Sequence, residues 1–484
     1  MFELVGNEAR VIAALGVVLA YSAYCFFQYR RFRLAEAGPA ARVPLPSGHA
    51  TEDANSARPI WVIHASQSGQ AEAIAQQSVA ALTAAGRVVR TARIESDWIT
   101  QLGDASYVLF VVSTHGEGDA PDHATRFVRT RLQAGAHPGL KGVSYGLLAL
   151  GDRNYAQFCG FGRALDAWLL ASGALALFPR IEANRLDAQS LVSWSQALGK
   201  LGTKHSAQQG SATQAATIGL TQEAGFAPWH FVERTQLNAG SAGLALCKVR
   251  LKPASIALPS WQAGDLAEVV MTGEARHPRS YSIANLPEDG VIELIVRTRV
   301  RDDGLIGKAS GWLNETARVD DMVMLRVRRN AGFRLEAGTD TPLILIGAGA
   351  GLAGLRGHLM ARAQALRAAD LAPPERCAWL IFGERSAEHD RPCADEFARW
   401  QNEGVLTRAD FTFSRDDSER PYVQHVLREQ AQSLRDWLEH GACVLVCGAA
   451  KTMGHGVDEA LREVLGSDSV DALVEAGRIR RDVF

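Results

Sequence analysis

The sequence has no Cys-x-x-Cys pair and almost no net charge. Its seven cysteines lie at positions 25, 159, 247, 377, 393, 443 and 447, so none has a partner three residues away. An iron–sulfur or zinc site is therefore not expected, and we predict no bound metal. The formal net charge is −2, which gives no support for nucleic-acid binding.

Internal repeats of a fixed short period are also absent, which argues against a solenoid or a propeller. What the chain does have is 47% hydrophobic and 21% charged residues, a composition typical of globular proteins with large buried cores. Its length of 484 residues predicts about three domains of ordinary size.

One long apolar run stands near the amino end. Residues 11–29 contain no charged side chain, and as a helix they would span about 28 Å, close to the hydrocarbon core of a bilayer. Arg30, Arg31 and Arg33 follow, which by the positive-inside rule puts the catalytic domains in the cytoplasm. A cleaved signal peptide is the alternative, but the basic cluster lies on the wrong side of the run. We predict a single-pass membrane anchor over residues 1–33, in the inner membrane if the source is bacterial.

The chain after this run begins with a linker and a patterned domain. Residues 34–57 are rich in Ala, Pro, Gly and Ser, which predicts a linker. Residues 58–201 alternate apolar runs with helical patterns, which predicts an α/β fold with a doubly wound parallel sheet. The expected strands are residues 59–65, 107–114, 144–152 and 175–181.

A second polar linker, over residues 202–222, precedes two further domains. Residues 223–338 hold short β-rich runs between Gly, Pro and Asp turns, which predicts an antiparallel barrel. In residues 339–484 the strand–helix alternation returns, which predicts a second parallel sheet. The expected barrel strands are residues 231–239, 244–253, 265–273, 279–285, 291–300 and 321–329, and those of the second sheet are residues 342–351, 377–385, 407–414 and 443–450.

Ligands of open parallel sheets bind beyond the carboxyl ends of the strands. The stretch "HASQSGQAE" (64–72) lies at such a place, between an apolar run and an amphipathic helix. Its small residues leave the backbone N–H groups of the helix start accessible, which is the outline of a phosphate site. A plain capped turn is the alternative. The candidate residues are Ser66, Gln67, Ser68, Gly69 and Gln70.

Two more loops follow expected strands of the same sheet, at residues 113–124 and 150–162. The first combines glycines with a histidine and acids, and the second combines aromatic side chains with amide and acid groups. A flat aromatic ligand that carries a phosphate would use both loops, whereas each loop alone also fits a tight turn. The candidate residues are Ser113, Thr114, His115, Gly116, Gly118, Gly151, Asp152, Tyr155 and Phe158.

These loops resemble the flavodoxin-like domain of the diflavin reductases, a family that includes the sulfite reductase flavoprotein subunit and the microsomal NADPH–cytochrome reductase. "SQSG" is similar to the family's phosphate loop, and "STHGEG" is similar to its second flavin loop. The resemblance implies FMN, with the phosphate on residues 66–70 and the isoalloxazine between residues 113–118 and Tyr155. His115 replaces a tyrosine of the microsomal enzymes, a departure that would alter stacking and the flavin potential.

The resemblance continues in the expected barrel and implies FAD. "RSYSIAN" (279–285) matches the family motif R-x-Y-S, in which Arg279 would bind the pyrophosphate, Tyr281 would pack on the isoalloxazine and Ser282 would lie near the flavin N5. "GKASGWL" resembles the second pyrophosphate loop. It would offer Gly307, Lys308, Ala309 and Ser310 at a helix start.

The last domain resembles the family's NADPH-binding domain. "LIGAGAG" is similar to its glycine-rich turn, with Gly349 present and Ala350 in the place of a threonine. "FTFSRDDSERPYVQ" is similar to the loop that holds the 2′-phosphate and the adenine, since guanidinium groups suit a phosphate dianion and an aromatic ring suits a base. The residues that match are Ser414, Arg415, Arg420, Tyr422 and Gln424.

Two final stretches complete the hydride-transfer site that the family implies. Cys447, from "VLVCGAA", and Asp482, from "RRDVF", would meet Ser282 near the nicotinamide. The terminal Phe484 would cover the FAD ring until the nicotinamide displaces it.

The resemblance covers about residues 58–484 and implies a membrane-anchored NADPH-dependent flavoprotein oxidoreductase. Electrons would pass from NADPH through FAD and FMN to a redox partner protein, a membrane-associated haem or ferric system. The chain would be a compact version, because the segment before Arg279 is too short for the family's helical connecting domain. Two alternatives stay open: the flavoprotein subunit of a sulfite reductase-type complex, and a non-catalytic electron-transfer scaffold, since Ala350, Gly354 and Ala449 depart from the family motifs.

Overall fold

A computed structural model describes residues 58–95, 98–102, 107–115, 118–133, 135, 139–153, 157–202, 225–271, 278–301, 303–335, 338–419 and 421–484. The chain divides into two units, Met1–Ala54 and Asn55–Phe484, and the description below concerns the second. Several predictions lie outside the described residues: the anchor (1–33), the first linker (34–57), residues 203–222 of the second linker, and the site residues Gly116, Tyr155 and Arg420.

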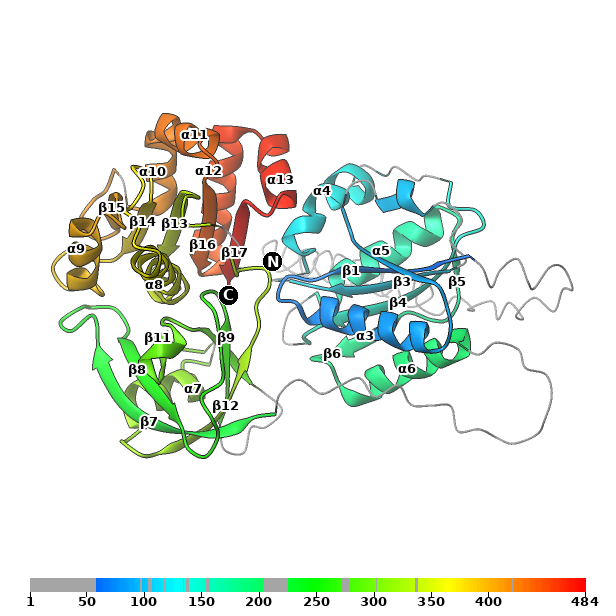
Figure 1. The fold of residues 1–484 in the computed structure, drawn as a ribbon, viewed down its shortest axis with the longest axis horizontal. Coiled ribbons are helices and arrows are strands. Elements are labelled where there is room, and N and C mark those ends of the chain that lie inside the picture. The colour runs from blue at the N-terminus through cyan, green and yellow to red at the C-terminus, as the bar shows by residue number, and fades with distance from the viewer. Residues whose placement is uncertain are drawn as a thin grey trace, which may run out of the picture. The chain divides into compact units, whose positions relative to one another are not determined.

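The first part of the second unit holds a parallel sheet with strand order β2-β1-β3-β4-β5, in which β6 also pairs with β4 (Figure 1). Helices α3 and α6 pack on one face through Ile74 and Trp194, while α4 and α5 pack on the other through Phe127 and Trp168. The strands and helices are β1 (Ile60–Ala65), α3 (Gln70–Ala84), β2 (Val89–Arg93), β3 (Tyr107–Ser113), α4 (Thr125–Phe127), β4 (Ser144–Gly151), α5 (Gly160–Ala171), β5 (Leu175–Ala176), β6 (Ile181–Asn184) and α6 (Ala188–Gly202).

Two features of this sheet differ from the expected strands. The expected strand 175–181 is interrupted and becomes the short strands β5 and β6, because Pro179 has no backbone N–H to donate to a ladder. The edge strand β2 was not predicted. Its side chains are mostly exposed, so it lacks the apolar run that marks the buried strands.

The middle part is an antiparallel sheet with strand order β10-β9-β12-β7-β8-β11. An isolated bridge between Ile283, just after β10, and Leu294 of β11 joins the two ends of this order, as a barrel requires. Its interior holds Trp229, Val249 and Ile292. The elements are β7 (Ala227–Gln236), β8 (Leu246–Pro253), β9 (Leu266–Val270), β10 (Arg279–Ser282), β11 (Ile292–Arg297), α7 (Lys308–Gly311) and β12 (Met322–Arg328).

The last part is a second parallel sheet, with strand order β15-β14-β13-β16-β17 (Figure 1). Helices α8 and α9 cover one face through Leu355 and Phe397, and α10 to α13 cover the other through Val426 and Val457. The elements are β13 (Leu343–Ala348), α8 (Leu352–Ala368), β14 (Ala378–Glu384), α9 (Ala394–Asn402), β15 (Arg408–Phe413), α10 (Val423–Glu429), α11 (Ala431–Glu439), β16 (Cys443–Gly448), α12 (His455–Leu465), α13 (Ser467–Glu475) and β17 (Ile479–Val483).

The strand β17 was not predicted as a strand, because its residues "IRRDV" carry three charges in five positions. It pairs in parallel with β16, which sets Cys447 beside Asp482. Within the described part of the chain, no helix is long and apolar enough to cross a membrane, and the apolar run at residues 11–29 lies outside that part.

Candidate flavin and nicotinamide sites

The predicted phosphate loop joins β1 to the amino end of α3. Gly69 takes a left-handed conformation with φ 84° as the residue before the helix. The Ser66 Oγ accepts the backbone N–H of Ala71 at 3.1 Å, in the first turn. A Cβ atom on Gly69 would lie 3.8 Å from the Cβ of Ala331, an ordinary contact, so a methyl group fits here without a clash. Small residues and free space at a helix start fit a phosphate group.

A hydrogen-bond network ties this loop to the second flavin loop. The Gln67 backbone N–H donates to Ser113 Oγ at 3.4 Å, and the Ser113 hydroxyl donates to the Ala65 carbonyl at 3.2 Å. The Gln67 side chain donates to Asp122 Oδ2 at 3.0 Å and accepts the Asp122 backbone N–H at 2.9 Å. The hydroxyl of Thr114 is buried and has no hydrogen-bond partner among the described residues. A buried polar atom of this kind fits a ligand that supplies the missing partner.

The second loop turns sharply at His115, whose backbone N–H and C=O both bond to Asp119 at 2.9 Å. It packs against the third loop, since a Cβ on Gly118 would lie 2.7 Å from the Cβ of Gln157. The two loops therefore touch at the carboxyl edge of the sheet.

The third loop uses some predicted groups internally. Asp152 forms an ion pair with Arg185 at 2.8 Å. The Phe158 ring lies between two guanidinium groups, 5.1 Å from that of Arg153 and 5.7 Å from that of Arg163. Packing requires a glycine at position 151, because a Cβ there would lie 2.8 Å from the backbone nitrogen of Cys159.

The R-x-Y-S strand β10 pairs with β9, which sets Tyr281 opposite Ala267 and Ser282 opposite Leu266. Arg279 is exposed, Tyr281 is half-buried and Ser282 is buried. Burial raises the pKa of the Tyr281 hydroxyl to about 12, so the ring stays neutral. The strand thus offers a guanidinium group at its start and a buried hydroxyl at its end.

The predicted second pyrophosphate loop leads into the short helix α7. The Ser310 hydroxyl donates to the Gly307 carbonyl at 3.2 Å and accepts the Arg299 N–H at 3.0 Å. Ala309 and Ser310 are buried, and Lys308 is exposed. The Ser310 side chain therefore holds the shape of the loop.

The three residues predicted for hydride transfer come together at one point. The Ser282 hydroxyl donates to Asp482 Oδ2 at 2.6 Å, and the Cys447 Sγ lies 3.9 Å from the same oxygen. Ser282 comes from the barrel strand β10, whereas the other two lie side by side on β16 and β17. A hydroxyl, a thiol and a carboxyl from three separate segments thus form one cluster.

Glycines make this cluster possible by letting the backbone of α8 approach β16. A Cβ on Gly351 would lie 2.0 Å from the carbonyl oxygen of Cys447. A Cβ on Gly354 would lie 3.1 Å from Cys447 Sγ and 2.9 Å from the ring of Phe333. Gly354, which departs from the proline of the family motif, therefore leaves room for the thiol and for the Phe333 ring.

Burial biases the cluster toward protonated groups. It raises the pKa of the Cys447 thiol well above its usual value, and the adjacent Asp482 carboxylate raises it further. Burial also raises the pKa of Asp482, while the Ser282 hydrogen bond and the charges of Arg328 and His115 oppose that rise. The thiol consequently stays neutral, and His115 of the second flavin loop lies near enough to act on the Asp482 carboxyl.

The glycine-rich turn and the predicted 2′-phosphate loop lie at the carboxyl edge of the second sheet. Gly349 has φ 57° and Ala350 follows it in a single 3₁₀ turn before α8. Ser414 and the exposed Arg415 follow β15, and their N–H groups bond to the carbonyls of Glu384 and Arg385 at 2.9 and 2.8 Å.

The aromatic residue of this site is available at the surface. Tyr422 precedes α10 and is 53% exposed, with its ring 5.8 Å from that of His425. Gln424 lies in the first turn of α10, with its side chain against Gly456. Phe484 is 63% exposed, and its backbone bonds to the loop after β16 through Gly448 and Ala450.

Sequence reasoning missed several residues at these edges. The Arg297 guanidinium donates to Glu384 at 2.6 Å and lies 3.4 Å from where a Cβ on Gly349 would stand. Arg481 forms ion pairs with Asp122 at 3.1 Å and with Asp458 at 2.6 Å. The only sequence feature that could have pointed to Arg481 is its position next to Asp482.

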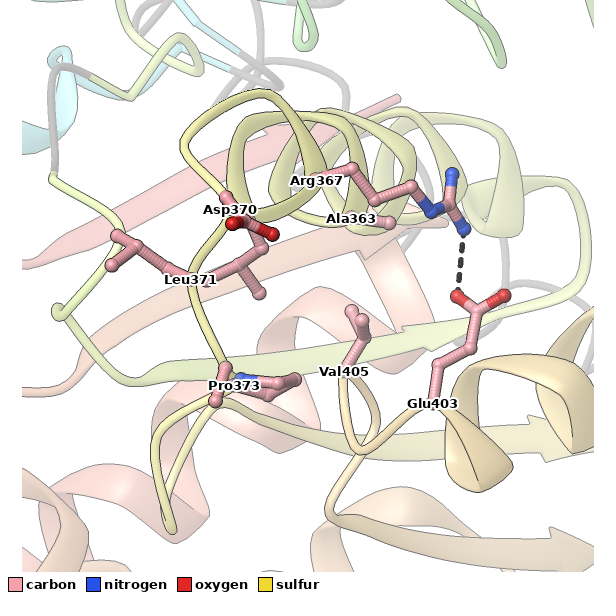
Figure 2. A pocket seen from close by; sticks show the side chains of 9 residues that line it. Ala363, Arg367, Asp370, Leu371, Pro373, Glu403 and Val405 are labelled. Atoms are coloured by element: carbon pink, nitrogen blue, oxygen red, sulfur yellow. Dashed lines mark hydrogen bonds and ion pairs between the residues drawn. The ribbon is translucent and has the colours of Figure 1, made fainter.

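A hollow of about 360 Å³ on the second parallel-sheet domain is not part of these sites (Figure 2). Leu371, Pro373 and Val405 line it, and Arg367 donates to Glu403 across its rim at 2.7 Å (Figure 2). It lies between the end of α8 and the start of β14, at the amino edge of the sheet. None of the predicted site residues lines it.

Comparison with known proteins gives two family matches. Residues 62–194 match a flavodoxin model and residues 345–459 match the oxidoreductase NAD-binding domain. Similar proteins include the "Sulfite reductase [NADPH] flavoprotein alpha-component" of Shewanella sp. (strain ANA-3), which is 27% identical over 556 aligned positions that cover 89% of this chain and 91% of the relative. Its counterpart in Neisseria meningitidis strain FAM18 is 26% identical and covers 93% of each chain. The 556 positions exceed the 484 residues of this chain, so the Shewanella relative carries segments that this chain lacks.

These comparisons contradict the predicted localisation. A single-pass membrane protein was expected from residues 11–29, but the relatives that match about nine-tenths of the chain are named as sulfite reductase components. An uncharged run of 19 residues meets the length of a membrane span without proving one. The prediction of a membrane localisation is therefore wrong.

The predicted cofactors agree with the matched domains, since a flavodoxin domain is joined to an oxidoreductase NAD-binding domain in one chain. Relatives that match along nearly the whole length have the same flavoprotein character in their names. The chain is a diflavin reductase-like enzyme, an NADPH-dependent flavoprotein oxidoreductase with FMN, FAD and NADPH as its cofactors.

Proposed function

We propose that the chain takes a hydride from NADPH beside the cluster of Ser282, Cys447 and Asp482 and passes electrons through its two flavins to a partner redox protein. The observation that supports this proposal most strongly is the 2.6 Å hydrogen bond from Ser282 to Asp482. It joins the barrel to the nicotinamide-type domain at the point where a reduced nicotinamide would meet a flavin.

The flavins supply hydride acceptance and one-electron transfer when bound, and the protein supplies position and electrostatics. The Asp482 carboxyl fixes the direction of the Ser282 hydroxyl, and the buried neutral Cys447 thiol closes the site against water. Gly354 lets the start of α8 pack directly against that thiol, since a Cβ there would lie 3.1 Å from Cys447 Sγ.

We assign the remaining predicted residues to the cofactors in the same way. Residues 66–70 and the second and third loops hold FMN, within a domain at residues 58–201. Arg279, Tyr281 and the loop of Gly307 to Ser310 hold FAD, within residues 223–338. The turn at Gly349, the loop of Ser414, Arg415 and Arg420, the adjacent Tyr422 and Gln424, and the terminal Phe484 serve the nicotinamide nucleotide and its exchange, within residues 339–484.

The partner that the relatives favour is the other component of a sulfite reductase, which holds the haem. The relatives named as the flavoprotein alpha-component match 89% or more of this chain. A test mixes the purified protein with a purified sulfite reductase haem component and measures NADPH-dependent formation of sulfide. Absence of sulfide, with normal reduction of a small dye, would direct the search to another haem or iron acceptor.

The hydride step is tested with the purified protein under anaerobic conditions. NADPH should bleach the flavin absorbance, and acid extraction should yield FMN and FAD in equal amounts. Asp482→Asn should slow bleaching by roughly 10- to 100-fold at unchanged flavin content, because one hydrogen bond to a charged group contributes about 1.5–3 kcal/mol. The exposed Glu439→Gln serves as the matched control. No bleaching of fully loaded enzyme would favour the non-catalytic scaffold instead.

A further inference from the structure

Three arginines lie beside the flavin-loop edge of the flavodoxin domain. Residues 122–133 follow the second flavin loop, and they place Arg126, Arg129 and Arg131 on one short helical segment. Arg126 and Arg129 lie about 6 and 10 Å along that segment from Asp122, which is hydrogen-bonded to Gln67 of the phosphate loop. A basic surface thus borders the predicted FMN site.

The segment has little acidic charge of its own to balance these arginines. Its one carboxylate, Asp122, is paired with Arg481 at 3.1 Å. The domain as a whole is also slightly basic, because residues 58–201 contain 13 Lys and Arg against 11 Asp and Glu, whereas the complete chain has a net charge of −2.

Carboxylates of α13 occupy this surface in the structure. Arg126 donates to Glu475 at 2.9 Å, and Arg129 donates to Asp468 at 2.7 Å and to Asp471 at 2.9 Å. The three carboxylates stand at positions i, i+3 and i+7, so they share one face of the helix. Helix α13 contains no basic residue.

These pairs have the character of an exchangeable contact. The side chains of Arg126 and Arg129 are 41% and 37% exposed, and that of Asp468 is 90% exposed. Ion pairs exposed to this degree contribute little stability. Asp471 is buried, but Arg462 holds its other oxygen at 2.8 Å, so it keeps a cationic partner when Arg129 leaves.

The flavin-loop edge of the flavodoxin domain must take part in two electron transfers. It receives electrons from another domain of the same chain, and it delivers them to an external protein. An acceptor that reaches this edge has to take the place of α13 on the arginines. We infer that the partner docks on the face formed by Arg126 and Arg129, hereafter the arginine face, through an acidic protein surface that imitates the carboxylates of α13. This inference rests on the proposed delivery of electrons to an external protein.

The test uses the full-length holoenzyme and two haem proteins of opposite charge, an acidic cytochrome b5 domain and the basic cytochrome c. The enzyme is first reduced by light with EDTA as the electron donor, so that the measured rate in stopped flow is delivery to the haem alone. The acidic probe should be reduced faster than the basic one, and its rate should fall by roughly 10-fold or more as salt rises from low to high concentration.

Charge reversal on the arginine face should invert this preference. Arg126→Glu with Arg129→Glu should lower the rate for the acidic probe by roughly 10-fold or more and raise the rate for the basic probe. Lys141→Glu with Lys200→Glu makes the same change of charge at two exposed residues of the opposite sheet edge and should change neither rate by more than about 2-fold. Equal effects of the two double variants would overturn the inference.

A second pair of substitutions approaches the contact from the other side and leaves the arginine face intact. Asp468→Asn with Glu475→Gln weakens the internal competitor, so the acidic probe should be reduced several-fold faster. An unchanged or slower rate in this variant would contradict the exchange of α13 for the partner. The rate measured with this variant also tests the inference if the charge-reversal variant fails to fold or loses FMN.

Two controls separate the inference from its alternatives. Reduction of the neutral quinone menadione should be the same in all variants, since it needs no protein docking. If NADPH fails to reduce the wild-type enzyme while the light-reduced enzyme still prefers the acidic probe, the proposed function fails and the arginine face stands. If the arginine face binds anionic lipid vesicles and the enzyme shows no preference between the two haem probes, the inference of an acidic protein partner is wrong. The arginine face would then bind a membrane surface.

Discussion

The two parallel sheets of this protein prepare their ligand edges by different means. In the first sheet most candidate groups lie on loops beyond the strand ends, and a Cβ on Gly69 would meet nothing closer than 3.8 Å. In the second sheet two candidate groups, Cys447 and Asp482, belong to the strands themselves. There a Cβ on Gly351 would lie 2.0 Å from a backbone oxygen.

The difference shows what each site depends on. Loop residues that present backbone N–H groups need conformational freedom and space, so they tolerate small changes of shape. Strand residues that form a buried cluster need the close approach of neighbouring backbones, because interiors are packed without spare volume. Position 351 of the second edge should therefore be much more sensitive than position 69 of the first to the addition of a single methyl group.

The largest loss of activity is expected when a single methyl group is added at Gly351. Gly351→Ala must push the start of α8 away from β16, and a displacement of about 1 Å at a reacting site costs on the order of 100-fold in rate. Gly69→Ala gains only an ordinary contact with Ala331 at 3.8 Å but places alanine at φ 84°, which costs about 1–2 kcal/mol. The measurements are kcat/KM for NADPH with a dye acceptor and the midpoint of urea unfolding. Similar losses of activity in both variants would show that the two ligand edges do not differ in their sensitivity to an added methyl group.

The next effect concerns nucleotide choice at the second edge. Arg415→Ala should lower kcat/KM for NADPH by roughly 10- to 100-fold and leave that for NADH nearly unchanged, because one charge-assisted bond to the 2′-phosphate is lost. Arg399→Ala, an exposed arginine on α9, is the control. Equal values for NADPH and NADH in the unmutated enzyme would contradict the assignment of Ser414, Arg415 and Arg420.

The two regions should also differ in their response to acid. Burial lowers the pKa of His64 and His123 in the first domain, and that of His358 in α8, from 6.5 to about 4. Between these values the unfolded chain binds more protons than the folded one, so stability falls as the pH drops below 6.5. At pH 5 each histidine should cost roughly 2 kcal/mol.

With two such histidines, the flavodoxin domain should lose about twice the stability of the nicotinamide domain. Hydrogen exchange resolved by peptide, at pH 7, 6 and 5, measures this loss in each domain. His358→Gln should reduce the loss in the second domain only, while the exposed His440→Gln should have no effect. Equal loss in both domains would show that other groups dominate.

The smallest effect is expected at the chain end. Phe484 is 63% exposed, so Phe484→Ala should change the free energy of unfolding by no more than about 0.5 kcal/mol. A role in covering the FAD ring predicts instead a several-fold change in the relative use of NADPH and NADH, or in product release. Unchanged kinetics with both nucleotides would exclude that role.

The buried strands of both sheets were predictable because their apolar runs are long and bounded by turn residues. Edge strands were not, as β2 and β17 show, since exposure or charge removes the apolar pattern. The apolar run at residues 11–29 led to the opposite error. Its length predicted a membrane localisation that the relatives contradict.

The sequence by itself determined the types of residue at each ligand edge, because glycine-rich turns and arginine–aromatic loops are local patterns. It could not determine which of them touch. The hydrogen bond from Ser282 to Asp482 joins residues 200 positions apart, and the pairing of Arg129 with α13 joins residues more than 300 apart. Contacts over such separations depend on how sheets, helices and loops pack in three dimensions, and only the tertiary structure decides them.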